Sequence, residues 1–122
     1  MRIDFGSIKP IYIQIAEEIE DNIISGILRE GDQAYSQLTL SRELGVNPAT
    51  AAKGISLLVQ KGVLEKQRGS SMVVAGGAKA RLLIEKREMS FMASINELIN
   101  EARKIGLSEE QVIAAIRETY AR

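Results

Sequence analysis

Apolar residues near the N-terminus recur at intervals of three and four positions, which is the period of an amphipathic helix. The stripe that they form consists of Tyr12, Ile15, Ile19, Ile23 and Ile27. Pro10 suits the first position of this helix, because the N–H that proline lacks has no partner there. Gly26 suits its C-terminal cap, and residues 30–32 (Glu-Gly-Asp) predict a turn. We therefore expect one helix from Pro10 to about Gly26.

Two shorter helical patterns follow this turn. The hydroxyl of Ser36 can cap the first of them, and Gly45 is expected to end it. Asn47 is a favourable N-cap for the second helix and Pro48 a favourable first residue, with Gly62 as its stop. Two short helices joined by a glycine-containing turn form a helix-turn-helix.

Gly54 falls inside the second of these helices, where glycine costs about 1 kcal/mol relative to alanine. We interpret it as the point where another helix crosses closely. The alternative is a neutral glycine on a face exposed to solvent.

Beyond Gly62, the pattern changes to short β-prone segments. Residues 63–67 and 71–74 flank Arg68, Gly69 and Ser70, which predicts a β-hairpin. A hairpin that follows a helix-turn-helix is a wing. The small residues 75–78 (Ala-Gly-Gly-Ala) then predict a hinge.

The C-terminal part has the pattern of two further helices. The apolar stripe of the first is Phe91, Ile95, Leu98, Ala102 and Ile105, widened by Met92 and Ile99, and that of the second is Val112, Ile116 and Tyr120. Gly106 separates them, and Ser108 with Gln111 has the form of a capping box. Some forty residues are too few to fold alone, so these stripes must pack on the N-terminal part or on another chain, and a symmetric partner is the simplest choice.

Composition narrows the possible chemistry. The 122 residues include no cysteine and no histidine, so disulfides, thiolate chemistry and the commonest general base and metal ligand are absent. No group of carboxylates has the spacing of a metal site, and we expect neither a cofactor nor a metal. No apolar run reaches the length of a membrane span, and residues 1–6 lack a signal pattern, so we expect a cytoplasmic protein that is not an enzyme.

Charge is balanced overall but unevenly distributed. The formal net charge is zero, yet residues 4–32 carry seven acidic and two basic side chains, and residues 36–69 carry five basic and two acidic ones. A neutral protein with one basic segment can present a positive face to phosphate. Ordinary scatter of solvated charge is the alternative interpretation.

From about Pro10 to Val74, the sequence resembles the GntR family of bacterial regulators. The residues that carry the resemblance are Pro10-Ile11-Tyr12, Gly26, Gly31-Asp32, Ser36, residues 43–48 (Glu-Leu-Gly-Val-Asn-Pro), Thr50, Leu58, Gly62, Leu64-Glu65 and Arg68-Gly69. The short two-helix tail resembles the YtrA subgroup in size and helical pattern. The resemblance implies an α+β, mostly helical fold: a winged helix-turn-helix DNA-binding domain over residues 1–76 and a helical dimerisation arm over residues 77–122.

The resemblance also implies that the second of the paired helices enters the major groove and the wing reaches the minor groove. The positions that would then contact DNA are Ser36, Gln37, Asn47, Ala49, Thr50, Lys53, Arg68, Gly69 and Ser70. Thr50 and Ser36 would donate to phosphate, Lys53 would reach a phosphate or a guanine edge, and Arg68 would enter the minor groove.

Four departures from the family pattern affect this expectation. Leu38 and Ala52 stand where many members have arginine, residues 34–35 are Ala-Tyr in place of Leu-Pro, and Ser71 replaces the second wing glycine. The chain thus has fewer cationic side chains for reading bases, and we expect weaker or more shape-dependent recognition.

The sequence favours a transcriptional regulator that binds an inverted-repeat operator as a homodimer, and we expect it to act as a repressor. The alternative is a winged-helix protein-interaction module whose DNA binding is weak or lost. For Met89, Phe91 and Met92, packing in a dimer is preferred over an effector pocket, because methionine and aromatic residues are common in helical interfaces. The existence of a small-molecule effector is left open.

Overall fold

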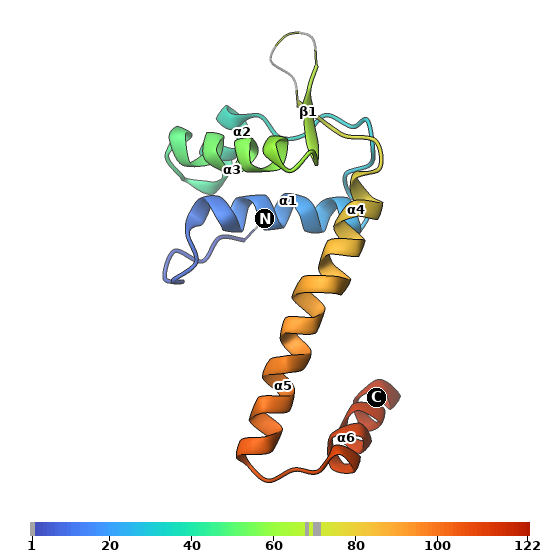
Figure 1. The fold of residues 1–122 in the computed structure, drawn as a ribbon. Coiled ribbons are helices and arrows are strands. Elements are labelled where there is room, and N and C mark those ends of the chain that lie inside the picture. The colour runs from blue at the N-terminus through green and yellow to red at the C-terminus, as the bar shows by residue number, and fades with distance from the viewer. Residues whose placement is uncertain (1, 68, 70–71) are drawn as a thin grey trace. The chain divides into compact units, whose positions relative to one another are not determined.

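The computed structural model describes residues 2–67, 69 and 72–122. The chain is mostly helical with a small two-stranded antiparallel sheet (Figure 1), which confirms the expected α+β class. It forms two compact units, Met1–Leu83 and Ile84–Arg122. No helix in the described part of the chain is both long and apolar enough to cross a membrane.

Helix α1 (Ile11–Ile24) provides the central apolar surface of the first unit. Ile15, Ile19 and Ile23 are buried, as the stripe predicts. Pro10 is the N-cap and not the first helical residue, since its ψ of 145° is extended while its carbonyl already accepts from the N–H of Gln14. The stripe also fails at Ile27: the helix has ended by then, and Ile27 is 68% exposed.

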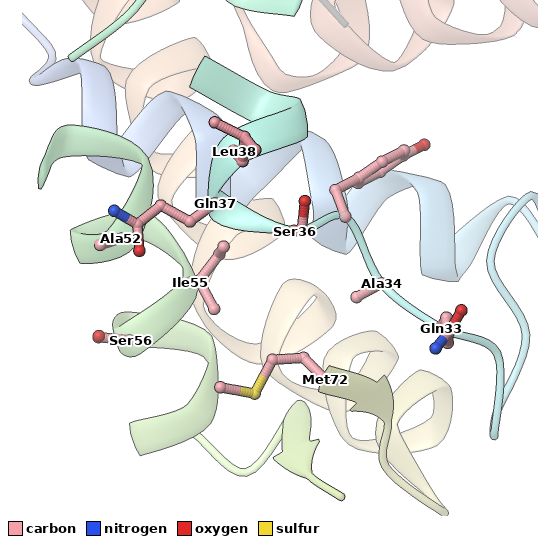
Figure 2. A pocket seen from close by; sticks show the side chains of 10 residues that line it. Gln33, Ala34, Ser36, Gln37, Leu38, Ala52, Ile55, Ser56 and Met72 are labelled. Carbon is pink, nitrogen blue, oxygen red and sulfur yellow. The ribbon is translucent and has the colours of Figure 1, made fainter. Parts of the chain in front are cut away.

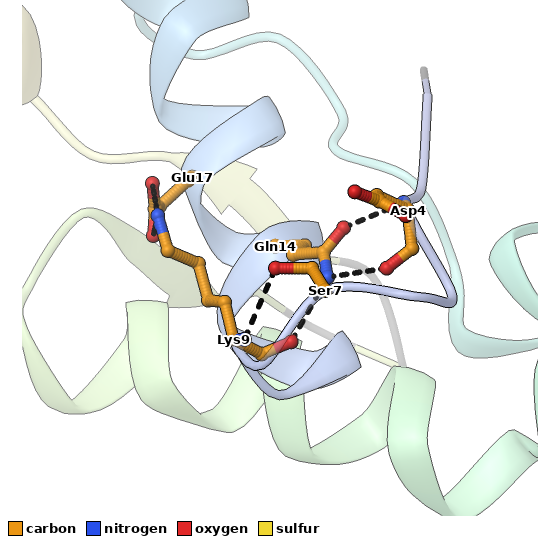
Figure 3. Close-up of polar contacts among 5 residues, drawn as sticks. All are labelled: Asp4, Ser7, Lys9, Gln14 and Glu17. Carbon is orange, nitrogen blue, oxygen red and sulfur yellow. Dashed lines mark hydrogen bonds and ion pairs between the residues drawn. The ribbon is translucent and has the colours of Figure 1, made fainter.

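The segment before α1 is bound to the helix through one side chain (Figure 3). The Gln14 carboxamide accepts from the Asp4 N–H at 2.7 Å and donates to the carbonyls of Asp4 and Lys9, each at 2.9 Å. Lys9 in turn forms an exposed ion pair with Glu17 at 3.0 Å. The start of the chain is thereby held against the first turns of α1.

Helices α2 (Gln37–Leu44) and α3 (Pro48–Gln60) form the helix-turn-helix, and α3 packs on both α1 and α2. A Cβ added at Gly54 would lie 3.0 Å from the Tyr12 carbonyl oxygen and 3.1 Å from Cγ2 of Ile15. Those distances are shorter than ordinary van der Waals contact, so α1 and α3 cross closely at this glycine, as its position in the sequence predicts.

Strands β1 (Leu64–Lys66) and β2 (Met72–Val74) pair in antiparallel register, with Leu64 opposite Val74. The loop that precedes α2 also joins this sheet, because the Ala34 N–H donates to the Met72 carbonyl at 2.8 Å and Gln33 forms a bridge with Val73. The hairpin base is therefore tied to the segment that leads into α2.

Helix α4 (Ala78–Glu85) follows the predicted hinge, where Gly77 has a φ of 78°. The N–H of Gly77 donates to the Glu30 carboxylate at 2.9 Å. Ala78 and Leu82 belong to the same buried cluster as the apolar residues of α1 and α3. The start of α4 is thus part of the first unit's core, whereas the division of function between residues 1–76 and 77–122 stays a prediction.

The second unit contains a π-helical turn, η1 (Lys86–Phe91), followed by α5 (Met92–Lys104) and α6 (Glu109–Ala121). Gly106 ends the α5 segment with a φ of 76°, and Ser108 and Gln111 form the predicted capping box. The π-helical turn was not predicted, because its six residues include only two large apolar ones, Met89 and Phe91, which are too few to show a period. Among residues 84–122, only Ala102 and Val112 are buried.

Candidate nucleic-acid interface

The N-terminus of α2 is set by Ser36. Its hydroxyl accepts from the Thr39 N–H at 3.1 Å and donates to the Thr39 hydroxyl at 2.8 Å, which satisfies one of the N–H groups that a helix start leaves unpaired. Gln37 and Leu38 follow in the first turn, and both are exposed. The start of α2 therefore exposes a carboxamide and an aliphatic side chain next to each other.

The turn into α3 is equally well defined. Gly45 adopts the left-handed conformation at φ 64°, which a glycine reaches without steric cost. The Ser41 hydroxyl donates to the Val46 carbonyl at 2.8 Å, and the Asn47 side-chain oxygen accepts from the Ala49 N–H at 2.8 Å. These local bonds fix where α3 begins, and they confirm the predicted caps.

The two faces of α3 differ sharply. Ala51, Gly54, Ile55 and Leu58 are buried against the core. Ala49, Lys53 and Ser56 are exposed on the other side, at helical spacings of four and three, and Thr50 is half-buried beside them. Ser56 is not among the DNA contacts predicted from the sequence, although its position three residues after Lys53 would have indicated it.

Lys53 has an aromatic neighbour that the sequence did not predict. Its ammonium nitrogen lies 4.2 Å from the ring centroid of Tyr12, which is a cation–π distance. The contact joins an exposed side chain of α3 to the first turn of α1. Tyr12 therefore restrains the one cation on the N-terminal half of α3.

The C-terminal end of α3 is held by charged side chains from two other helices. Lys61 forms an ion pair with Glu20 of α1 at 2.6 Å, and the Glu20 side chain is only 6% exposed. From α4, the Arg81 guanidinium donates to the Gly62 carbonyl at 2.6 Å. These contacts fix α3 relative to α1 and α4.

Of the remaining predicted residues, only Gly69 is among those that the structure describes. Gly69 has a φ of 82° and is exposed. Arg68 and Ser70 lie outside the residues that the structure describes, as does Ser71, so their predicted roles at the wing are not addressed by it.

A cleft opens between the start of α2, the exposed flank of α3 and strand β2 (Figure 2). Its volume is about 460 Å³, and the residues that line it are Gln33, Ala34, Tyr35, Ser36, Gln37, Leu38, Ala52, Ile55, Ser56 and Met72. None of these ten side chains carries a formal charge. The cleft therefore combines hydrogen-bonding groups with aliphatic surface and no cation.

The predicted residues thus fall into three groups. Ser36 and Gln37 meet at the cleft, together with Leu38 and Ala52, which stand where many family members have arginine. A second group lies outside the cleft, at the N-cap and along the first turns of α3, and consists of Asn47, Ala49, Thr50 and Lys53. Gly69 is on the hairpin. In the described part of the chain, no three acidic residues come close enough together to form a metal site.

The chain is similar in sequence and in fold to known bacterial regulators. The family model described as "Bacterial regulatory proteins, gntR family" matches residues 11–74. The HTH-type transcriptional repressor YtrA of Bacillus subtilis is 30% identical over 99% of this chain and 92% of its own length. A GntR family transcriptional regulator from Listeria monocytogenes superposes with a TM-score of 0.75 at 26% identity, over 93% of this chain and 98% of its own.

A second similar structure is of a complex with operator DNA. The DNA-binding domain of AraR in complex with operator ORX1 has a TM-score of 0.56 and 28% identity, and the match covers 62% of this chain and 96% of that domain. GntR-family proteins are DNA-binding regulators and not enzymes. With a helix-turn-helix, a hairpin and a family match across both, the chain is a member of the GntR family and a DNA-binding transcriptional regulator.

Proposed function

We propose that this regulator is a repressor that binds an inverted-repeat operator as a homodimer held together by its second unit. The observation that carries the dimer is the lack of a core in that unit, where Ala102 and Val112 are the only buried residues among 84–122. A segment of this size with so little buried surface does not stabilise itself. A second copy is the simplest source of the missing contacts.

The apolar surface to be covered lies on both flanks of the α5–α6 pair. One flank is a groove of about 480 Å³ that includes Ile105 and Tyr120, and the other is a groove of about 470 Å³ that includes Ile95 and Ile113. Ile116 lines both. We assign these flanks to the partner copy and not to a small-molecule effector, since they carry large exposed apolar side chains such as Ile105 and Tyr120 on helix faces that a symmetric interface would cover.

In this proposal, α3 enters the major groove and the hairpin reaches the minor groove. The residues assigned to DNA are Ser36, Gln37, Asn47, Ala49, Thr50, Lys53, Arg68, Gly69 and Ser70. Lys53 contributes most of the electrostatic attraction along α3, because Ala49, Thr50 and Ser56 are uncharged. The hydroxyl of Thr50 and the free N–H groups at the start of α3 position the helix on phosphate.

The repressor role is supported by the similarity to YtrA, which is named a transcriptional repressor and which this chain matches along nearly its whole length. A two-fold dimer presents two copies of α3, so the preferred site is an inverted repeat. If the two helices enter successive major grooves on one face of DNA, the half-site centres lie about 10 base pairs apart.

The test combines DNA selection with sedimentation of the full-length chain. Rounds of selection from a random duplex library in low salt should enrich an inverted repeat, and sedimentation velocity should give a dimer at micromolar concentration. Ile116→Glu should shift the chain toward monomer and weaken operator binding at least tenfold. Glu118→Gln, on the same helix but outside both grooves, is the matched control and should change neither.

Two results would contradict the proposal. A monomeric wild-type chain with full operator affinity would rule out the dimer. Failure to enrich any DNA in low salt would favour the alternative of a winged-helix interaction module.

A further inference from the structure

The cleft beside α3 is bordered by an exposed aliphatic side chain, which is unusual for a surface proposed to face nucleic acid. Leu38 lines the cleft and is 56% exposed, although it stands in the first turn of α2 next to polar Ser36 and Gln37. Ala52, half-buried on α3, lines the same cleft. Two aliphatic side chains from two helices therefore border one opening.

The polar groups of the cleft are all neutral. In Figure 2 the carboxamide of Gln37 is directed from α2 toward the α3 side of the cleft, and Ser56 stands on α3 beyond Ala52. A guanine edge offers two acceptors and is bound best by arginine or lysine. No lining residue of the cleft is of either type.

One base pair matches this combination of surfaces. In the major groove only thymine carries a methyl group, which apolar side chains contact, while adenine offers the donor and acceptor that a glutamine or asparagine carboxamide pairs with. An aliphatic border beside a carboxamide thus has the complementary chemistry of a thymine–adenine pair.

We infer that Leu38, with Ala52, contacts the C5-methyl group of one thymine in each operator half-site, while Gln37 faces the adenine of the same or the adjacent pair. This inference rests on the proposed placement of α2 and α3 at the major groove. It makes Leu38 a specificity-determining residue that acts without charge.

Deoxyuridine provides a direct test, because it differs from thymidine only by the methyl group. Each thymine of the selected operator is replaced in turn by deoxyuridine in both half-sites, and binding of the full-length protein is measured by fluorescence anisotropy. At one symmetric position we expect affinity to fall about fourfold per half-site, the effect of burying roughly one methyl group.

Leu38→Ala is expected to lower affinity for the thymine operator and to abolish the difference between thymine and deoxyuridine at that position alone. Ile27→Ala removes another exposed aliphatic side chain, outside the cleft, and should leave the thymine-to-deoxyuridine ratio unchanged. Because Leu38 is exposed, its truncation should not affect folding, which circular dichroism can verify.

The outcomes separate this inference from the proposed function. If the wild-type chain selects an operator but no thymine responds to loss of its methyl group, or if Leu38→Ala keeps the wild-type ratio, the thymine contact is wrong and the regulator stands. If no operator is selected, or if Thr50→Ala and Lys53→Met are both silent, the proposed placement of α3 fails first.

Discussion

Replacing Lys61 by methionine should destabilise the first unit more than any surface substitution of equal size. The change removes the cation that lies 2.6 Å from a Glu20 carboxylate whose side chain is 6% exposed. Stranding one charge of a fully buried pair costs about 3–5 kcal/mol. Lys61 itself is 28% exposed, so water can reach part of the stranded carboxylate, and we expect a loss of about 2–3 kcal/mol.

The double variant Glu20→Leu with Lys61→Met should recover most of this loss, because it removes the buried carboxylate together with its cation and fills the site with apolar volume. Lys9→Met is the matched control. Its ion pair with Glu17 spans 3.0 Å, but both side chains are well exposed, and such pairs contribute less than about 1 kcal/mol.

The assay is urea unfolding followed by circular dichroism at one fixed protomer concentration, since the stability of an oligomer depends on concentration. With a slope of about 1–3 kcal/mol per molar urea, Lys61→Met should lower the midpoint by about 0.7–3 M and the double variant by much less. A Lys61→Met midpoint no lower than that of Lys9→Met would refute the account of a buried, paired carboxylate.

Three further predictions concern the fold and the DNA-facing surface. A fragment ending at residue 77 should melt at a lower temperature than one ending at residue 83. The shorter fragment lacks Leu82, whose side chain is 1% exposed and whose burial contributes about 2–3 kcal/mol. Equal melting temperatures would exclude α4 from the core. Gly54→Val should destabilise the chain by about 1–3 kcal/mol, because the valine Cβ would lie 3.0 Å from the Tyr12 carbonyl oxygen. Chemical denaturation would measure the loss of stability, and a stabilised variant would argue against the close crossing of α1 and α3. Tyr12→Leu should weaken operator binding several-fold, but only when Lys53 is present. In a double-mutant cycle with Lys53→Met, additive losses of binding free energy would disprove that Tyr12 positions Lys53.

Features that depend on neighbouring residues in the chain were predictable from the sequence. The caps at Ser36, Asn47 and Ser108 are satisfied by N–H groups two or three residues away, so the local pattern already contains the donor and the acceptor. Gly54 was predictable for a different reason. A glycine in a helix interior is costly unless a close approach requires it, and the approach of α1 supplies that requirement.

Features that depend on three-dimensional proximity were not predictable. Tyr12 and Lys53 are far apart in the sequence, and no periodicity connects an aromatic ring of α1 with an ammonium group of α3. The cleft is formed by residues from three segments, so the sequence did not indicate that Leu38 and Gln37 border one opening with Ala52. Ile27 continued the apolar period of α1, but the helix had already ended, and the neighbouring Leu28 is buried in its place.

The measurement that tests the central claim most directly is a hydroxyl-radical footprint of the full-length chain on both strands of its selected operator, repeated over a range of salt concentrations. We expect protection with two-fold symmetry about the operator centre. We also expect a slope of log affinity against log salt of about −3 to −6, since each neutralised phosphate contributes about −0.9. An asymmetric footprint, or an affinity that does not change with salt, would contradict a dimeric regulator that approaches DNA through phosphate contacts.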